Sequence, residues 1–288
     1  MTSTSTTEDL RADAGALCRD IGERTLDTGL AAAERWLQRA FEAAGLAVER
    51  QEYAAWGAPV ANLVVHLGPA GDDPLVIGAH YDTVPGTEGA DDNGSSVCVL
   101  LALARRLARR PPSIPLRLVA FTLEEEPAFG TANQGSRVFV QRMREAGERP
   151  RGAIVLEMVG YTAATQAYPA PLRRAGYPET GDFIGIVANR RSRHLMRDLS
   201  RGLRRHPDLP VETLVAPCNG WLLPDVRLSD HSSFWDARWP AVMVTDTAYF
   251  RNPNYHRPSD RIETLDFDFM ARLVNSLDLA VETLGGRG

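Results

Sequence analysis

The sequence contains no lysine, so all 32 of its basic residues are arginine. Schiff-base catalysis, attachment of pyridoxal phosphate and a Walker-A phosphate loop each need a lysine side chain, and these functions are therefore excluded. Cysteine is also scarce, because Cys18, Cys98 and Cys218 are far apart and form no CxxC motif. This excludes a disulfide scaffold and a cysteine-rich zinc site, and it fits a reducing cytoplasm.

Long apolar runs are missing as well. No run approaches the roughly 18 residues of a membrane-spanning helix, and residues 1–8 are polar without the apolar core of a signal peptide. We therefore expect a cytoplasmic protein that does not bind membranes, with residues 1–8 flexible. The net charge of −5 argues against nucleic acid as a partner. The sequence does not indicate an oligomeric state.

The remaining composition is typical of a globular protein, with 44% hydrophobic and 24% charged residues. We interpret the 288 residues as a single catalytic domain. Apolar patterns and turn residues predict strands at 62–67, 75–80, 116–123, 153–158, 183–188 and 241–245, and helices at 30–43, 95–109, 134–146, 192–205 and 267–284. Strands alternating with helices predict an α/β fold in which helices cover both faces of a mixed, mainly parallel sheet, giving three layers.

Ligands in such folds bind beyond the carboxyl ends of the strands, and polar residues gather at these positions here. His80 ends one predicted strand, and Asp82 follows on the same side of the extended chain. This carboxylate could orient the imidazole of a metal ligand. A capped strand end with a surface histidine is the simpler interpretation of these two residues taken alone.

Acidic residues occupy comparable positions after two further elements. Asp91 and Asp92 precede a predicted helix, where they could simply cap its N-terminus. The run Glu124-Glu125-Glu126 directly follows an apolar strand, although acidic runs are usually solvated loops.

Two more polar positions complete the pattern. Glu157 interrupts an apolar strand, where a buried carboxylate needs a metal or a cationic partner. His256 lies in a proline-rich loop that could be an ordinary surface loop. Imidazole and carboxylate ligands together suit zinc or, less specifically, another divalent metal. The order His, Asp, Glu, Glu, His can hold two metals if one carboxylate bridges them.

Five sequence blocks extend this pattern. They are GAHYDTV, GADDNGS, FTLEEE, LEMVGY and the segment from SDHSSFW to NPNYHRPSD, in this order between about residues 75 and 265. With these blocks the chain resembles the co-catalytic di-zinc metallo-aminopeptidases, zinc exopeptidases related to bacterial leucyl aminopeptidases, glutamate carboxypeptidases and glutaminyl cyclases. The resemblance implies a hydrolase that removes N-terminal residues from peptides or small amides.

The resemblance also implies a role for each residue. His80 and Glu157 would bind one zinc ion, Glu125 and His256 the second, and Asp92 would bridge both. Asp82 would orient His80, and Glu124 would be the general base that takes a proton from the attacking water. Tyr249, Tyr255 and His231 are candidates for contacting the substrate or stabilising the oxyanion. Glu126 is a weaker candidate, because the third glutamate permits a one-residue shift of this assignment.

Other functions fit the sequence less well. A serine hydrolase would need a GxSxG motif, which is absent. A glutaminyl cyclase on the same fold typically uses one zinc ion and does not keep the first histidine, so His80 favours the hydrolase. A non-enzymatic relative would not need all five ligands and both catalytic acids. Carboxypeptidase-like or dipeptidase action stays open, because it needs a cation for the substrate carboxylate and the sequence does not indicate which arginine would supply it.

Overall fold

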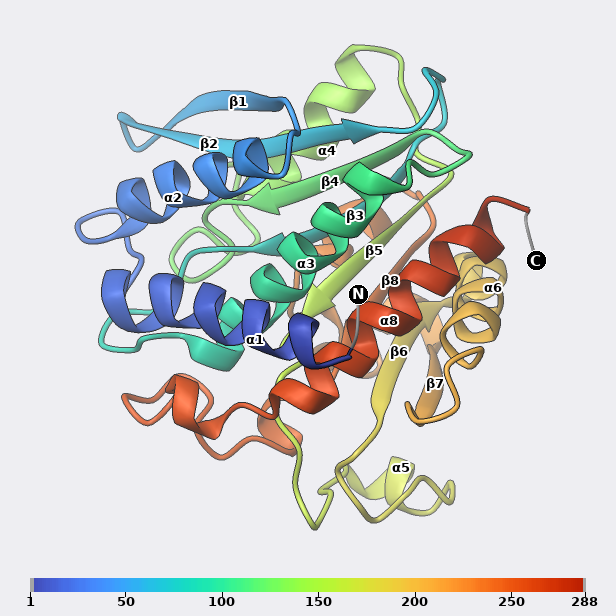
Figure 1. Cartoon of the computed structure of the whole chain (residues 1–288). Helices are drawn as coiled ribbons and strands as arrows, with labels where there is room; N and C mark the ends of the chain where they lie inside the picture. Colours follow the sequence, from blue (N-terminus) through green and yellow to red (C-terminus); the bar gives the residue numbers. More distant parts are fainter. Residues whose placement is uncertain (1–2, 287–288) are drawn as a thin grey trace.

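The architecture was analysed in a computed structural model, which describes residues 3–286 (Figure 1). Its strands are β1 (Val48–Ala55), β2 (Ala58–Leu67), β3 (Leu75–His80), β4 (Leu116–Phe121), β5 (Gly152–Glu157), β6 (Ile184–Asn189), β7 (Val211–Ala216) and β8 (Ala241–Thr245). Its α-helices are α1 (Ser3–Ala14), α2 (Leu30–Ala43), α3 (Ser96–Arg109), α4 (Gly135–Glu145), α5 (Ala170–Arg173), α6 (Arg193–Leu203), α7 (His231–Asp236) and α8 (Phe267–Leu284).

All eight strands form one mixed sheet in the order β1-β2-β4-β3-β5-β8-β6-β7. The central strands β4, β3, β5 and β8 are parallel to one another, whereas β2 is antiparallel to β4 and β6 is antiparallel to β8. Strand β7 runs parallel to β6. One edge of the sheet therefore combines the carboxyl ends of four strands with the beginnings of β6 and β7.

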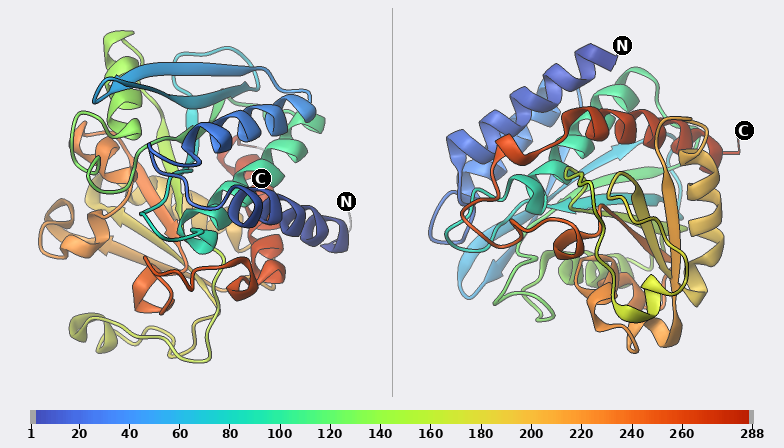
Figure 2. Two further views of the ribbon diagram at one scale, coloured as in Figure 1. Left: turned by 90° about the vertical axis from the view of Figure 1, so that its left-hand side faces the viewer. Right: turned by 90° about the horizontal axis from the view of Figure 1, so that it is seen from below.

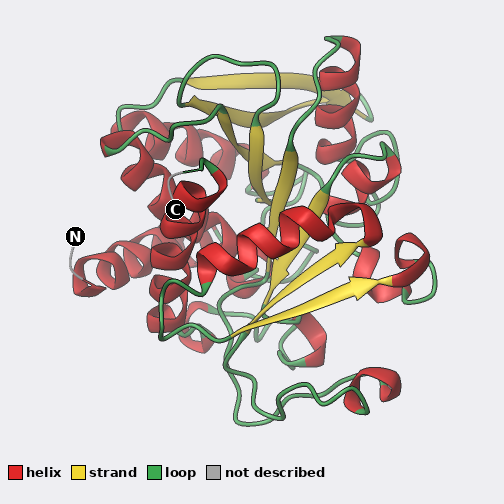
Figure 3. Cartoon of the chain, turned by 90° about the vertical axis from the view of Figure 1, so that its right-hand side faces the viewer, coloured by secondary structure: helices red, strands yellow, loops and turns green. Residues whose placement is uncertain are grey.

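Helices cover both faces of this sheet, which gives three layers (Figures 1 and 2). Helices α1, α2, α3, α6 and α8 pack on one face, and α4 and α7 pack on the other (Figure 3). Because side chains of a strand alternate between faces, Leu75 and Ile77 join the larger core while Val76 joins the smaller one. The predicted α/β class is confirmed.

The predicted elements are present with shifts of a few residues at their ends, and β3, β8, α2 and α8 have the predicted bounds. Strands β1 and β7 and helices α1, α5 and α7 were not predicted. We expected residues 1–8 to be flexible, but Ser3–Glu8 form the first turns of α1. Thr6 is buried there, and the Thr7 hydroxyl donates a hydrogen bond to Asp268. Residues 1 and 2 lie outside the described part of the chain. None of the described helices is long and apolar enough to cross a membrane.

Candidate metal centre and substrate pocket

The centre of the site is His80, the last residue of β3. Its side chain is only 1% exposed, and neither ring nitrogen has a hydrogen-bond partner among the described residues. Nε2 lies 3.5 Å from Oδ1 of Asp92 and 3.6 Å from Oε2 of Glu157. A buried imidazole without a partner is costly, and one that faces two carboxylates in this way is arranged as a metal ligand.

Asp92 connects His80 to a second group of ligand-type residues. Its other oxygen, Oδ2, lies 3.1 Å from Nε2 of His256, and this nitrogen is 3.4 Å from Oε2 of Glu125. Potential ligand atoms of His80, Asp92 and Glu157 lie within 4.8 Å of one another, and so do those of Asp92, Glu125 and His256. A third group, His80, Glu124 and Glu125, meets the same distance. The structure thus brings the five predicted ligands into two clusters that share Asp92.

The residues of these clusters fit bound divalent cations. Four carboxylates, those of Asp92, Glu124, Glu125 and Glu157, are each less than 10% exposed and face only two histidines. Ionised carboxylates at this depth are stable only when they are paired or bound to metal. The donor set contains nitrogen and oxygen but no sulfur, which suits zinc and, less specifically, other divalent metals.

Backbone hydrogen bonds fix the loops that carry these side chains. Asp82 accepts the N–H groups of Glu124 and Glu125 at 2.9 and 3.0 Å. Asp260 does the same for Asp91 and Asp92, at 2.9 and 3.1 Å. Each loop is therefore held by a carboxylate from elsewhere in the chain. Asp260 was not among the predicted site residues, although it ends the last of the five blocks.

Two further polar residues that were not predicted support Glu157. The Ser229 hydroxyl donates a 2.7 Å hydrogen bond to Oε2 of Glu157. The Asn93 side chain donates to the Leu156 carbonyl and accepts from the Met158 N–H group, so it holds the backbone on both sides of Glu157. Both residues belong to blocks that carry the family resemblance, but only the fold shows what they contact.

The backbone is strained at three positions, at His256 itself and at the neighbours of Glu124 and Glu157. Leu123, Met158 and His256 have φ angles of 53°, 47° and 56°. This left-handed region is uncommon for residues other than glycine, and such strain concentrates at functional sites. Leu123 precedes Glu124, and Met158 follows Glu157. The strain therefore coincides with the points where the chain turns these side chains into the cluster.

Burial and mutual repulsion set the protonation of the cluster. Burial raises the pKa of Glu124 well above its usual range; His80 opposes this rise, and the carboxylate of Glu157 adds to it. Burial and the charge of Asp92 raise the pKa of Glu125 to about 7. Burial alone would raise the pKa of Asp92, but the neighbouring imidazoles of His256 and His80 outweigh it and lower the pKa to about 2. Nearby cations lower a carboxylate pKa that burial has raised. A general base works best when its pKa lies near the working pH.

Glu126 and His231 lie outside both clusters. Glu126 is exposed, whereas Glu124 and Glu125 are buried, so the geometry favours the assignment without a one-residue shift. His231 is fully buried at the start of α7. Its Nε2 atom is 2.8 Å from the Val226 carbonyl and its ring packs edge-on against Trp235. Burial lowers its pKa to about 4. These contacts place His231 in the packing around α7 rather than among the ligand-type side chains.

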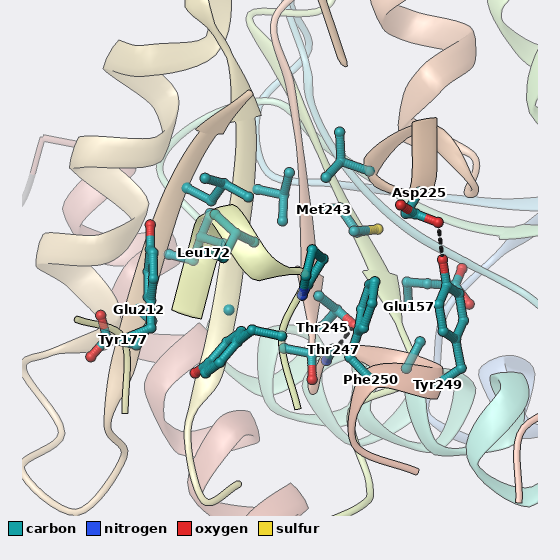
Figure 4. Close-up of a pocket in the computed structure, with 18 of the residues that line it drawn as sticks. Glu157, Leu172, Tyr177, Glu212, Asp225, Met243, Thr245, Thr247, Tyr249 and Phe250 are labelled. Carbon is teal, nitrogen blue, oxygen red and sulfur yellow. Dashed lines mark hydrogen bonds between the residues drawn. The ribbon is translucent and has the colours of Figure 1, made fainter. Parts of the chain in front are cut away.

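The two candidate tyrosines line a pocket beside the cluster. The Tyr255 ring stacks on His256, with 3.8 Å between ring centroids, and Tyr249 packs against Tyr255. The Tyr249 hydroxyl donates a hydrogen bond to Asp225 at the same end of the pocket (Figure 4). The walls are mostly apolar and include Leu172, Phe183, Ile186, Leu214, Leu228, Met243 and Phe250. Glu157 belongs both to this pocket and to the clusters of ligand-type residues.

Comparisons with known proteins agree with this geometry. The sequence model of Peptidase family M28 matches residues 62–279. The uncharacterized protein YfbL of Escherichia coli K12 is 34% identical over 284 residues, which are 94% of this chain and 86% of YfbL.

Solved structures share the fold at lower sequence identity. The LapA aminopeptidase of Legionella pneumophila superposes with a TM-score of 0.74 at 21% identity, over 99% of this chain and 72% of LapA. The glutaminyl cyclase of Bacteroides thetaiotaomicron has a TM-score of 0.72 at 17% identity, over 96% of this chain and 97% of the cyclase. One fold therefore carries both activities, and the side chains of the site must distinguish them.

Proposed function

The chain belongs to peptidase family M28, and from this premise we propose that it is a zinc aminopeptidase that uses two zinc ions to hydrolyse the N-terminal peptide bond of its substrates. The observation that carries the proposal is the pair of three-residue clusters that share Asp92. A bridging carboxylate between two histidine-containing clusters is suited to two metals rather than one. His80 supports the hydrolase in particular, because the cyclase alternative does not require it.

In the proposed reaction each residue of the site has a separate role. When bound, zinc polarises a carbonyl group and lowers the pKa of a water molecule. Glu124 belongs to neither of the two clusters that share Asp92; its Oε2 lies 3.8 Å from Nε2 of His80, and with His80 and Glu125 it forms a third group of ligand-type atoms. It takes the proton of the attacking water and later delivers it to the leaving amine. Asp82 keeps Glu124 in place through its backbone.

Tyr255 is the better-placed of the tyrosine candidates for contacting the substrate oxygen. Its ring is fixed by stacking on His256 and it lines the pocket next to Glu157. The Tyr249 hydroxyl is engaged by Asp225. We propose that Tyr255 donates a hydrogen bond to the developing oxyanion, the role for which donors fixed in advance are most effective.

Metal analysis combined with turnover tests this function. The purified chain should bind two zinc ions, hydrolyse aminoacyl p-nitroanilides and lose activity on chelation, with recovery when zinc is added. His80→Ala and His256→Ala should each lose one ion. A fully active protein with one tightly bound ion would contradict the two-metal proposal.

Glutaminyl cyclase activity is the second candidate, because the fold is shared with a cyclase. A cyclase converts an N-terminal glutamine to pyroglutamate with release of ammonia and leaves peptide bonds intact. Incubation with a glutaminyl peptide, followed by mass spectrometry, separates the two reactions. Loss of the first residue supports the aminopeptidase, and loss of 17 mass units (NH₃) without cleavage supports the cyclase.

A further inference from the structure

The floor of the apolar pocket is a row of four residues that crosses four neighbouring strands. Glu157 on β5 pairs with Thr245 on β8, Thr245 pairs with Gly185 on β6, and Gly185 pairs with Glu212 on β7. All four line the pocket. Neighbouring strands lie about 4.8 Å apart, so the backbones of the two glutamates are separated by roughly 14 Å. Figure 4 shows Glu157 at one end of the pocket and Glu212 with Tyr177 at the other.

The end of the pocket at Glu212 has features of a cation site. The rings of Tyr168 and Tyr177 lie 5.8 Å apart, and their hydroxyls are fixed by hydrogen bonds to the carbonyls of Pro178 and Thr213. Burial and the charge of Glu212 raise the pKa of Tyr168 and of Tyr177, and for Tyr168 the positive charge of Arg251 opposes the rise. Two fixed aromatic rings beside a carboxylate attract cations through both the ring faces and the charge.

Glu212 has no cation of its own within the described range 3–286. It forms no ion pair with a described residue, whereas the other carboxylates of the pocket have partners: Asp225 accepts from Tyr249, and Glu157 accepts from Ser229. The nearby Arg251 contacts other residues and forms no ion pair with Glu212 in the described part of the chain. Its guanidinium stacks on Phe183 and donates to Gln166 and to the Tyr161 carbonyl.

From this arrangement we propose that the pocket accepts a long basic side chain, that of an N-terminal arginine or lysine, with the aliphatic stem on the apolar walls and the cationic group between Tyr168, Tyr177 and Glu212. The span between the two glutamates is longer than a leucine side chain covers, and Gly185 leaves the middle of the floor free for the stem. The inference deepens the proposed aminopeptidase function and rests on it.

The test compares three substrates with long unbranched side chains, of which two are charged and one is not. The zinc-loaded full chain is assayed with the p-nitroanilides of lysine, arginine and norleucine, because norleucine has an unbranched aliphatic side chain like the lysine stem but no ammonium group. The wild type should cleave the two basic substrates at least as efficiently as norleucine. Glu212→Gln should lower kcat/KM for arginine and lysine by about tenfold or more and leave norleucine unchanged. Glu179→Gln, on the exposed loop that follows Tyr177, is the matched control and should change none of the three.

Two results would overturn the inference. One is cleavage of norleucine at least tenfold more efficient than that of lysine and arginine by the wild type. The other is an equal effect of Glu212→Gln on all three substrates, which would show a structural role. Calorimetric binding of argininamide and norleucinamide to the zinc-loaded protein keeps the two proposals separate. A preference for argininamide that is lost in Glu212→Gln, without any turnover, would support the pocket and contradict the aminopeptidase function.

Discussion

The Oδ1 atom of Asp82 lies 3.3 Å from Nδ1 of His80, on the side of the imidazole that faces away from Asp92. Both oxygens of the same carboxylate accept backbone N–H groups of the loop that begins at Glu124. A single side chain therefore orients a predicted zinc ligand and positions the predicted general base. Such supporting contacts usually contribute strongly to metal affinity.

Asp82→Asn should weaken zinc binding at the cluster of His80. The amide keeps the size of the side chain but presents an NH₂ group to at least one of the N–H donors that the carboxylate now accepts. We expect zinc affinity at one of the two sites to fall by about 10- to 100-fold. A competition titration with a chelator measures this change. Asp72→Asn, at an exposed position, is the control, and unchanged affinity in Asp82→Asn would refute the orienting role.

Glu124→Gln and Glu125→Gln should have different effects. Glutamine at position 124 cannot accept a proton, so turnover should fall by about 10²–10⁴-fold while both metals stay bound. Glutamine at position 125 weakens a predicted ligand, so occupancy of the second site should fall. Metal content and kcat measured on the same samples distinguish the two. A variant at Glu125 that keeps both metals but loses turnover would move the base to that position.

The metal-free protein should lose stability as the pH rises. The folded-state pKa values of Glu125, Asp230 and Asp260 are raised, chiefly by burial, to about 7, 7 and 8. For His256, Asp92 and Glu125 outweigh burial and raise the pKa to about 10. The folded state thus binds more protons than the unfolded state between about pH 5 and 9, and its stability decreases with pH across this range.

Zinc should remove much of this dependence, because it stabilises the ionised carboxylates. Thermal unfolding of the metal-free and zinc-loaded forms from pH 5 to 9 tests the prediction. The gap between their Tm values should widen with pH. A metal-free protein that becomes more stable toward pH 9 would contradict it.

Arg24 should be essential for stability. Its side chain is fully buried, and its guanidinium donates to the carbonyls of Gly22, Tyr81, Glu88 and Gly89 around the loop that links His80 to Asp92. Arg24→Lys removes the planar fork that makes these contacts and leaves buried carbonyls without donors. Since each costs about 1–3 kcal/mol, we expect a loss of roughly 3 kcal/mol or more in the free energy of unfolding. Arg19→Lys, at an exposed position in the same segment, should have little effect in urea unfolding.

Part of the candidate metal site could be predicted because two of its residues end parallel strands. His80 and Glu157 are the last residues of β3 and β5, and such strand ends meet at one edge of the sheet. The register of Glu124 was harder to predict, because three consecutive glutamates follow the strand. Only burial in the fold separates Glu126 from the other two.

The supporting contacts and the pocket could not be predicted in the same way. Asp260 binds the backbone of Asp91 and Asp92 from about 170 positions away in the chain, and no local pattern indicates that contact. Helix α1 is polar at its start and resembles a flexible terminus, yet tertiary packing orders it. Strand β7 is half-exposed at the edge of the sheet, so its sequence lacks the apolar run that identified the other strands. For the same reason Glu212, which lies in β7, was not among the predicted site residues.

Strands β6 and β7 run opposite to β8. At this edge of the sheet the chain therefore leaves β3, β4, β5 and β8 but enters β6 and β7. His80, Glu124, Glu125 and Glu157 lie where the chain leaves β3, β4 and β5. The pocket wall combines the segment that enters β6, from Tyr168 to Phe183, with residues of β7 and with segments that follow β7 and β8. Insertions or substitutions in the segment that enters β6 can thus alter the pocket wall. The strand ends that carry His80 and Glu157 keep their places. Because Glu157 and the segment that carries Tyr255 and His256 belong to both parts, the segment that enters β6 is the part of the pocket that mutation or laboratory selection can change without rebuilding the cluster of ligand-type residues.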